Sequence, residues 1–301
     1  MAGQPDDWQS GLPRPLAFAL SGGASLGAIQ VGMLRALAAV GMEPDLVVGT
    51  SVGSLNGAVV AQHATLGPAV DRLDHIWRGL ERHDVLPGVP IAQATSILRT
   101  GHLHPRRGLV RLIRRSLAVR TFADLARPFT VVASDVLTGH VRWFNSGEVL
   151  RPLLAATAIP GVFPPVVIEG RHYWDAGSVA NVPLNAAVAA GAASIVVLDA
   201  GDVCHLDEPP RGIPDALLTS VMTAMRQRVL IEAPAVAEHL PVLYLPRPCT
   251  HNRSLLDFGS SSELIVPTEE VVSEFLRTAE QPRTGHLVGA PHHHPDREPV
   301  G

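Results

Sequence analysis

The chain has 301 residues, a hydrophobic fraction of 46% and a formal net charge of −4 at pH 7. This length and apolar content fit a single α/β domain with a large buried core. No basic block offsets the acidic balance, so the sequence excludes a general nucleic-acid binder, which would carry a basic face. All 24 basic residues are arginine. This excludes chemistry that needs lysine, such as a P-loop, a Schiff base or a Ser–Lys dyad.

Three regions are expected along the chain. Residues 1–14 predict a flexible N-terminal arm without the pattern of a signal peptide. Residues 15–281 form the folded domain, and residues 282–301, rich in Pro, Gly and His, predict a disordered tail. The longest apolar runs are shorter than the ~20 residues of a membrane-spanning helix. Cys204 and Cys249 form no zinc or CxxC pattern, which indicates a reducing, cytoplasmic location.

Two strand–turn–helix units open the domain. An apolar run at 16–20 leads through a glycine turn into helical spacing of apolar residues at 27–40. A second apolar run at 46–48 leads through a second glycine turn into a helix at 52–62. Two such units in succession predict an α/β fold, with three α/β/α layers around a mostly parallel central sheet.

The middle of the chain is predicted to be mainly helical, and its residues 106–119 have two distinct faces. One face carries arginines and the other is largely apolar. Two interpretations remain open: a surface helix packed on the core, or a helix that rests on anionic lipid headgroups. Further strands are predicted at 129–133, 141–144, 195–198 and 242–245.

The second glycine turn, Gly49-Thr50-Ser51-Val52-Gly53, has the pattern G-x-S-x-G. It lies between an apolar strand and a helix, which is the setting of a nucleophile elbow. In such an elbow a sharp turn lifts the serine hydroxyl clear of the backbone, and flanking glycines let the strand and helix approach closely. Ser51 is therefore a candidate nucleophile, and the alternative is an ordinary strand-to-helix turn.

The first glycine turn, with Gly22, Gly23, Ala24 and Gly27, also precedes a helix. Unpaired N–H groups at a helix start attract an anion. The turn is therefore a candidate oxyanion hole for acyl transfer or a candidate nucleotide-phosphate site. The nucleotide interpretation is disfavoured because Ala24 breaks the pattern G-x-G-x-x-G and no acidic residue ends the second strand.

Together with Trp174-Asp175-Ala176-Gly177, these turns resemble the patatin-like phospholipases from about Pro15 to Asp199. That family carries a glycine-rich oxyanion loop, a G-x-S-x-G elbow and a D-G-[GA] turn, in this order. The stretches Ala158 to Pro165 and Asp135 to Gly139 also resemble family motifs. The sequence departs from the family at Ala24 and Ala176, where glycine is usual, and at Leu26, where Arg or Lys is frequent.

The resemblance implies a Ser–Asp dyad without histidine. Ser51 would be the nucleophile, Asp175 its base, and the N–H groups of Gly22, Gly23 and Ala24 the oxyanion hole, with Gly177 closing the aspartate turn. Burial beside Trp174 would raise the pKa of Asp175 and make it a better base. At position 24, a positive φ would cost an alanine roughly 1–2 kcal/mol, whereas a position inside the helix would cost nothing.

The implied activity is hydrolysis of lipid carboxylic esters, with a lipid or ester as the partner and without metal or organic cofactor. Two other functions stay open: an acyltransferase that uses the same acyl-enzyme, and a non-catalytic anion- or nucleotide-binding module. A Ser–His–Asp triad is the mechanistic alternative. Its candidate bases are His239, His251 and His286. His205 and the tract 292–294 are expected to be solvated. Peripheral contact with a membrane surface is a further expectation, and the sequence leaves the oligomeric state open.

Overall fold

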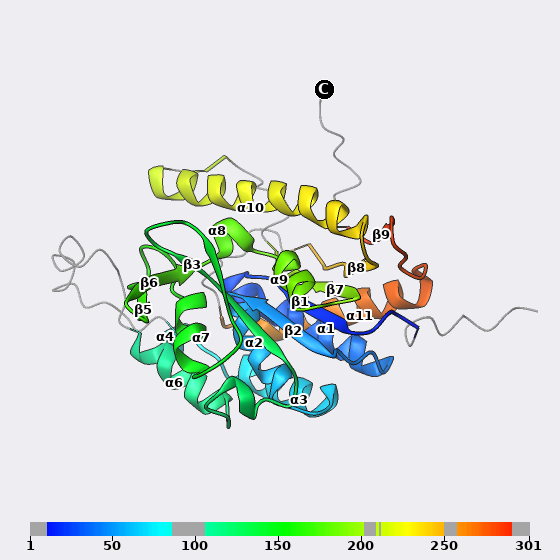
Figure 1. Cartoon of the computed structure of the whole chain (residues 1–301), viewed down its shortest axis with the longest axis horizontal. Coiled ribbons are helices and arrows are strands. Elements are labelled where there is room, and N and C mark those ends of the chain that lie inside the picture. The colour runs from blue at the N-terminus through cyan, green and yellow to red at the C-terminus, as the bar shows by residue number, and fades with distance from the viewer. Residues whose placement is uncertain (1–10, 86–105, 202–208, 211, 250–257, 291–301) are drawn as a thin grey trace, which may run out of the picture.

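The computed structural model describes residues 11–85, 106–201, 209–210, 212–249 and 258–290, and Figure 1 shows their arrangement. Within these residues, nine strands form one sheet in the order β5-β6-β3-β2-β1-β7-β8-β9, with β4 paired to β3. The pairs from β3 through β2, β1, β7 and β8 to β9 are parallel, and the pairs of β4, β5 and β6 are antiparallel. The strands are β1 (Leu16–Leu20), β2 (Leu46–Thr50), β3 (Phe129–Asp135), β4 (Val141–Phe144), β5 (Val166–Ile168), β6 (Arg171–Asp175), β7 (Ser194–Leu198), β8 (Val242–Tyr244) and β9 (Leu287–Val288).

Helices cover both faces of this sheet, so the predicted three-layer α/β/α fold with a mostly parallel sheet is confirmed (Figure 1). The larger core lies between the sheet and the layer of α1, α2, α3, α6, α7 and α11. The smaller core lies on the opposite face, against α9 and α10. The helices are α1 (Gly27–Ala39), α2 (Val52–Ala61), α3 (Leu66–Arg78), α4 (Arg82–Val85), α6 (Arg107–Ser116), α7 (Leu150–Ala156), α8 (Gly177–Ala180), α9 (Leu184–Ala189), α10 (Ile213–Ala237) and α11 (Ser261–Thr278), with 3₁₀ turns η2 (Ala24–Leu26) and η4 (Phe122–Asp124).

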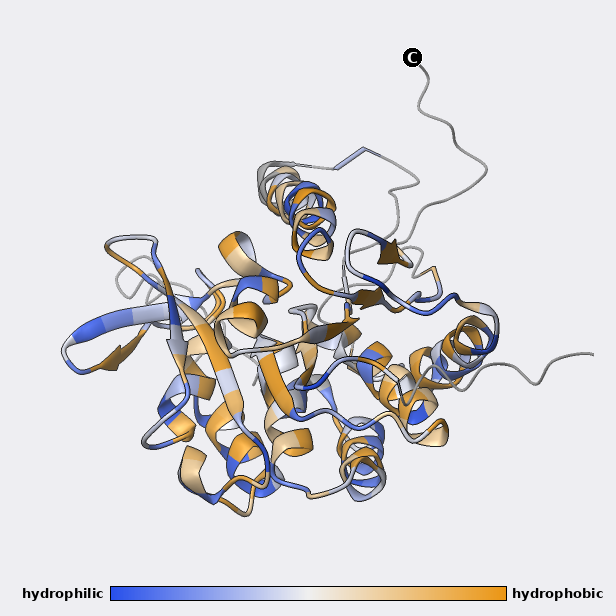
Figure 2. Ribbon diagram, turned by 45° about the vertical axis from the view of Figure 1, so that its right-hand side comes forward, coloured by the Kyte–Doolittle hydropathy of each residue, from blue (hydrophilic) through white to orange (hydrophobic). Residues whose placement is uncertain are grey.

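The central strands form where the sequence has continuous apolar runs. All five residues of β1, β2 and β7 are buried, as expected for parallel strands covered on both faces. Figure 2 shows the hydrophobic residues concentrated along these strands and on the helices beside them. Helix α1 ends where predicted, since Gly41 follows it with a φ of 68°, a conformation that favours glycine.

The structure differs from the expected organisation at the C-terminal end. The predicted tail starts at Pro282, yet residues 282–290 are described and contain β9, which pairs in parallel with β8. A two-residue strand next to glycines carries too weak an alternation to be predicted from sequence. Residues 1–10 of the predicted arm and 291–301 of the tail lie outside the described residues.

The arginine-rich helix is α6, and its apolar face is turned inward. Leu109, Leu112 and Ile113 are buried, whereas Arg111 and Arg114 are exposed. The structure therefore favours a surface helix packed on the core, because these apolar side chains already contact the protein interior. In the described part of the chain, no helix combines the length and the apolar character needed to cross a membrane.

Candidate active site

Ser51 occupies the sharp turn between β2 and α2. Its φ of 51° and ψ of −128° lie in a region that residues other than glycine rarely adopt, and such strained positions gather at functional sites. The flanking glycines permit the turn. A Cβ on Gly49 would lie 2.5 Å from the carbonyl oxygen of Gly53, and a Cβ on Gly53 would collide with the carbonyl of Leu20. This turn therefore has the backbone geometry expected of a nucleophile elbow, and β1, β2 and α2 meet closely there.

Asp175 reaches this turn from β6. That strand pairs with β3 so that Asp175 is opposite Ala133, and β3 runs parallel to β2, which ends directly before Ser51. The hydroxyl of Ser51 donates a hydrogen bond to Oδ2 of Asp175. Two residues 124 positions apart in the chain therefore meet, as their predicted roles require.

The carboxylate of Asp175 is held in place by the main chain around it. The N–H of Gly177 donates to Oδ1 over 2.8 Å, and the N–H of Asp175 itself donates to the carbonyl of Ala158 over 3.0 Å. Burial raises the pKa of Asp175 to about 6, against the lowering effect of the hydrogen bonds from Ser51 and Gly177. A base with this pKa is well matched to proton transfer near neutral pH.

The glycine-rich loop between β1 and α1 offers two main-chain donors. The N–H of Gly22 already donates to the carbonyl of Asn181 over 3.1 Å. The N–H groups of Gly23 and Ala24 have no hydrogen-bond partner among the described residues. Of the three predicted oxyanion donors, only Gly23 and Ala24 are therefore available in this structure.

Position 24 shows why the departure from the family pattern matters. Ala24 has a φ of 49° and at the same time begins the 3₁₀ turn η2. The first of the two alternatives therefore applies, and the alanine carries strain of roughly 1–2 kcal/mol. Gly27, three residues on, is required by packing. A Cβ there would lie 2.5 Å from Val52 and 2.7 Å from the ring of Trp77.

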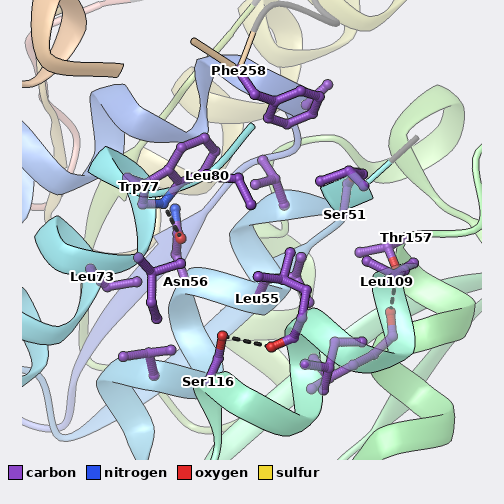
Figure 3. Close-up of a pocket in the computed structure, with 18 of the residues that line it drawn as sticks. Ser51, Leu55, Asn56, Leu73, Trp77, Leu80, Leu109, Ser116, Thr157 and Phe258 are labelled. Carbon is purple, nitrogen blue, oxygen red and sulfur yellow. Dashed lines mark hydrogen bonds between the residues drawn. The ribbon is translucent and has the colours of Figure 1, made fainter. Parts of the chain in front are cut away.

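A cavity with an apolar lining opens at Ser51 and lies between α2, α3, α6 and α7 (Figure 3). Leu55 and Val59 of α2, Leu73 of α3 and Leu112 of α6 contribute to its wall, and Ser116 lies at the far end of α6. The carbonyl of Ser116 accepts a hydrogen bond from Gln62, the residue that follows α2. The lining residues on α2 run from Val52 to Val59, which corresponds to roughly 10 Å of helix.

The polar side chains in the cavity wall are engaged with the protein itself. The hydroxyl of Ser116 donates to the carbonyl of Leu112 over 2.8 Å, and that of Thr157 donates to the carbonyl of Leu153 over 2.7 Å. Apart from the mouth at Ser51, the wall therefore presents an apolar surface, which suits a hydrocarbon chain.

A buried chain of hydrogen bonds joins this wall to the glycine-rich loop. The indole N–H of Trp77 donates to Oδ1 of Asn56 over 2.9 Å, and Nδ2 of Asn56 donates to Oε1 of Gln30 over 2.8 Å. Nε2 of Gln30 donates to the carbonyls of Ser21, over 2.9 Å, and Leu198, over 3.1 Å. Buried networks that satisfy their polar groups in this way make the local structure rigid.

Sequence reasoning missed Gln30, Asn56 and Asn181. A signal for the first two was present, because each is a polar residue within an apolar helix pattern, where a buried amide needs a partner. Asn181 gave no signal, since its main-chain carbonyl is what binds Gly22.

Of the histidines proposed as alternative bases, the two that the structure describes, His239 and His286, do not approach Ser51. His239 precedes β8 and His286 precedes β9, so both lie at the amino ends of parallel strands, whereas Ser51 follows the carboxyl end of β2. No cluster of metal-ligating side chains occurs among the residues that the structure describes. The remaining predictions on histidine and cysteine concern residues outside the described ranges, namely His205, His251, residues 292–294 and Cys204.

Comparison with known proteins agrees with these motifs. The family model "Patatin-like phospholipase" matches residues 18–188, more than half of the chain. Lysophospholipase NTE1 of Mycosarcoma maydis is 30% identical over 209 residues, which cover 67% of this chain and 10% of that protein. Patatin-like phospholipase domain-containing protein 6 of Homo sapiens is 27% identical, over 64% of this chain and 14% of that protein.

The chain thus spans only a small part of the length of these relatives. Among solved structures, VipD from Legionella pneumophila aligns with a TM-score of 0.48 and 15% identity, over 88% of this chain and 67% of that one.

Proposed function

Because the chain belongs to the patatin-like phospholipase family, we propose that it hydrolyses carboxylic esters of lipids, with Ser51 as nucleophile and Asp175 as base. The observation that carries this proposal is the hydrogen bond from the Ser51 hydroxyl to the buried Asp175 carboxylate, located at the mouth of an apolar cavity. A nucleophile within hydrogen-bond reach of its base is the signature of covalent catalysis by serine.

In the first half of the reaction, Oγ of Ser51 attacks the ester carbonyl while its proton passes to Oδ2 of Asp175. The carbonyl oxygen becomes an oxyanion, which the free N–H groups of Gly23 and Ala24 stabilise. As the tetrahedral intermediate collapses, the alcohol part of the lipid leaves and takes the proton from Asp175. The acyl group then remains on Ser51 as an ester.

In the second half, water replaces the alcohol. Asp175 accepts a proton from the water, the resulting hydroxide attacks the acyl-Ser51 carbonyl, and the same two N–H groups hold the second oxyanion. Collapse of this intermediate returns the proton from Asp175 to Oγ of Ser51. The fatty acid leaves, and the hydrogen bond of the resting enzyme is restored.

The cavity supports a substrate with an apolar acyl part. Its apolar wall begins at Ser51 and continues along α2, so an acyl chain bonded to Ser51 would lie in it and remove its methylene groups from water. Each buried methylene contributes about 0.8 kcal/mol to binding. This favours an ester with a long hydrocarbon chain over a short, soluble ester.

Hydrolysis of p-nitrophenyl esters of graded chain length tests the proposal. Ser51→Ala and Asp175→Asn should each lower kcat by at least about a thousandfold, since activity would fall toward the level left by the oxyanion hole and binding alone. Labelling by a fluorophosphonate should occur in the wild type and disappear in Ser51→Ala.

Two matched variants control for damage to the fold. Asp199→Asn changes another buried aspartate, which directly follows β7 and accepts a hydrogen bond from the hydroxyl of Tyr244 at the end of β8. Ser194→Ala removes another buried serine hydroxyl. Both should keep most of the activity. A Ser51→Ala or Asp175→Asn protein as active as these controls would refute the assigned roles.

A further inference from the structure

The peptide group that joins Gly22 to Gly23 is held from its carbonyl side by Ser21. The hydroxyl of Ser21 donates to the carbonyl oxygen of Gly22 over 2.8 Å and accepts the N–H of Ala200 over 2.8 Å. Ser21 is fully buried. A hydroxyl has a single proton, and here it is committed to the Gly22 carbonyl.

Fixing this carbonyl also fixes the direction of one oxyanion donor. The C=O and N–H bonds of a trans peptide lie in one plane and point in opposite directions. The carbonyl of Gly22 and the N–H of Gly23 belong to the same peptide group. The Ser21 hydroxyl therefore determines where the N–H of Gly23 points.

The second donor is oriented in another way. The carbonyl of Gly23, which shares a peptide group with the N–H of Ala24, accepts the N–H of Leu26 over 3.0 Å in the 3₁₀ turn. The main chain alone thus orients the N–H of Ala24. Of the two free donors, the N–H of Gly23 is the one whose direction depends on a side chain.

We propose that Ser21 is a positioning residue for the oxyanion hole, which acts through the peptide group between Gly22 and Gly23. This inference rests on the proposed function. Gln30 also holds the main chain at Ser21 in place, because its side-chain amide donates hydrogen bonds to the carbonyls of Ser21 and Leu198. The peptide group before Gly22 is thereby held as well, and the N–H of Gly22 stays on Asn181.

The chemical consequence is confined to the transition state. An N–H group that already points at the developing oxyanion needs no reorganisation when charge appears. The ground-state ester carries little charge on its carbonyl oxygen, so its binding depends weakly on this donor. Loss of the donor's orientation therefore lowers kcat and leaves KM nearly unchanged.

The test compares Ser21→Ala with Ser194→Ala in the full chain. Both variants remove a fully buried hydroxyl that donates to a main-chain carbonyl, and Ser194 lies at the amino end of β7, where it binds the carbonyl of Pro13 over 2.6 Å. We expect Ser21→Ala to lower kcat on a long-chain p-nitrophenyl ester roughly ten- to hundredfold, with KM within about twofold of wild type. Ser194→Ala should change neither constant beyond about twofold.

A second readout follows the oxyanion without turnover. An alkyl trifluoromethyl ketone forms a tetrahedral adduct with the serine, whereas the matching alkyl methyl ketone binds mainly as the ground-state carbonyl. Ser21→Ala should weaken binding of the trifluoromethyl ketone by the same factor by which it lowers kcat. The affinity for the methyl ketone should stay unchanged. Ser21→Cys, which keeps a weak donor, should lie between wild type and Ser21→Ala, and it carries the test where Ser21→Ala does not fold.

Each result has a defined meaning. Equal loss in Ser21→Ala and Ser194→Ala, or unchanged affinity of the trifluoromethyl ketone in the Ser21 variants, overturns the role of Ser21 while the role of Ser51 stands. A wild-type protein without hydrolysis that depends on Ser51 overturns the proposed function and this inference with it.

Discussion

The main-chain nitrogen of Gly22 lies 3.1 Å from the carbonyl oxygen of Asn181, and this hydrogen bond connects the glycine-rich loop to the end of α8, the short helix that follows Asp175. The two residues also touch through the Asn181 side chain. A Cβ on Gly22 would lie 2.5 Å from Oδ1 of Asn181 and 3.1 Å from Cβ of Ser51. The absence of a side chain at position 22 therefore lets the loop, the nucleophile and the aspartate turn lie against one another.

Replacement of Gly22 by alanine should disrupt the site more than the fold. The new methyl group must displace Asn181 or Ser51, so we expect kcat/KM to fall at least about a hundredfold, as small misplacements of catalytic groups do. Gly67→Ala is the matched control, because a Cβ there meets open space. Ester hydrolysis and the melting temperature of both variants decide the matter. Activity of Gly22→Ala close to that of Gly67→Ala would contradict the close contact.

The strain at Ala24 should be removable without loss of activity. Glycine adopts a φ of 49° without the clash of a Cβ. Ala24→Gly should therefore relieve the roughly 1–2 kcal/mol of strain in the folded state. Part of this gain in stability is offset, because glycine gives the unfolded chain more conformational freedom. We expect a net gain of up to about 1 kcal/mol in the free energy of unfolding in urea, with kcat unchanged because the N–H remains.

The control for this gain is a glycine placed where the chain is helical. Ala38→Gly, near the end of α1, should lower the free energy of unfolding by about 0.5–1 kcal/mol. If Ala24→Gly is destabilised to the same extent, the alanine is not strained in solution.

In the proposed reaction Asp175 is the base, so its pKa should set the pH dependence. The base must be ionised, and burial raises its pKa to about 6, so kcat/KM should rise with pH and level off above a midpoint near 6. The rise should persist in His239→Ala and His286→Ala. A midpoint that disappears in either variant would assign the essential group to that histidine.

The same pKa predicts a pH-dependent stability difference. A carboxyl whose pKa is higher in the folded protein than in the unfolded chain makes the folded state bind more protons, so stability falls as pH rises from about 4 to about 6. The change from 3.8 to about 6 corresponds to about 3 kcal/mol. Asp175→Asn has no titrating carboxyl at this position, so its free energy of unfolding does not fall in this way. The stability of the variant relative to wild type should therefore increase from about pH 4 to about pH 6 and stay constant above that interval. Urea unfolding at pH 4, 6 and 8 measures this difference, and an equal difference at all three would contradict the raised pKa.

The length of the cavity should limit the length of the acyl chain. Ser116→Phe would place a ring at the end of α6, so hydrolysis of long-chain p-nitrophenyl esters should fall about tenfold or more relative to short-chain esters. Ser220→Phe is the matched control. Both serines donate to a carbonyl four residues back, but Ser220 is exposed on α10. An unchanged chain-length profile in Ser116→Phe would place the acyl chain elsewhere.

The features that depend on neighbouring residues could be predicted from the sequence, whereas those that depend on residues far apart in the chain could not. The apolar runs of β1 and β2 and the glycines around Ser51 are local signals, and they predicted the strands, the elbow and the layers. Strand β6 has the sequence Arg-His-Tyr-Trp-Asp, with two exposed polar residues, and lacks an apolar run. Asp175 could therefore be assigned only through the family resemblance.

The oxyanion loop shows the opposite limit. A glycine turn before a helix predicts free N–H groups, but it does not reveal that a carbonyl 159 positions away uses one of them. The hydrogen bond from Gly22 to Asn181 forms only when the loop after β1 and the end of α8 meet at the folded sheet. Contacts of this kind depend on the topology of the fold, and a local sequence pattern does not predict them.

Because Ser116 and Thr157 direct their hydroxyl protons at backbone carbonyls, neither hydroxyl in the described wall of the cavity has a proton free to bind an incoming acyl chain. A fatty chain with a hydroxyl group along its length would lose its hydration there and gain no partner in return. Selection among acyl chains should therefore follow their length and width. Oxidised or hydroxylated chains should bind poorly, because their polar groups would be desolvated without gaining a hydrogen bond.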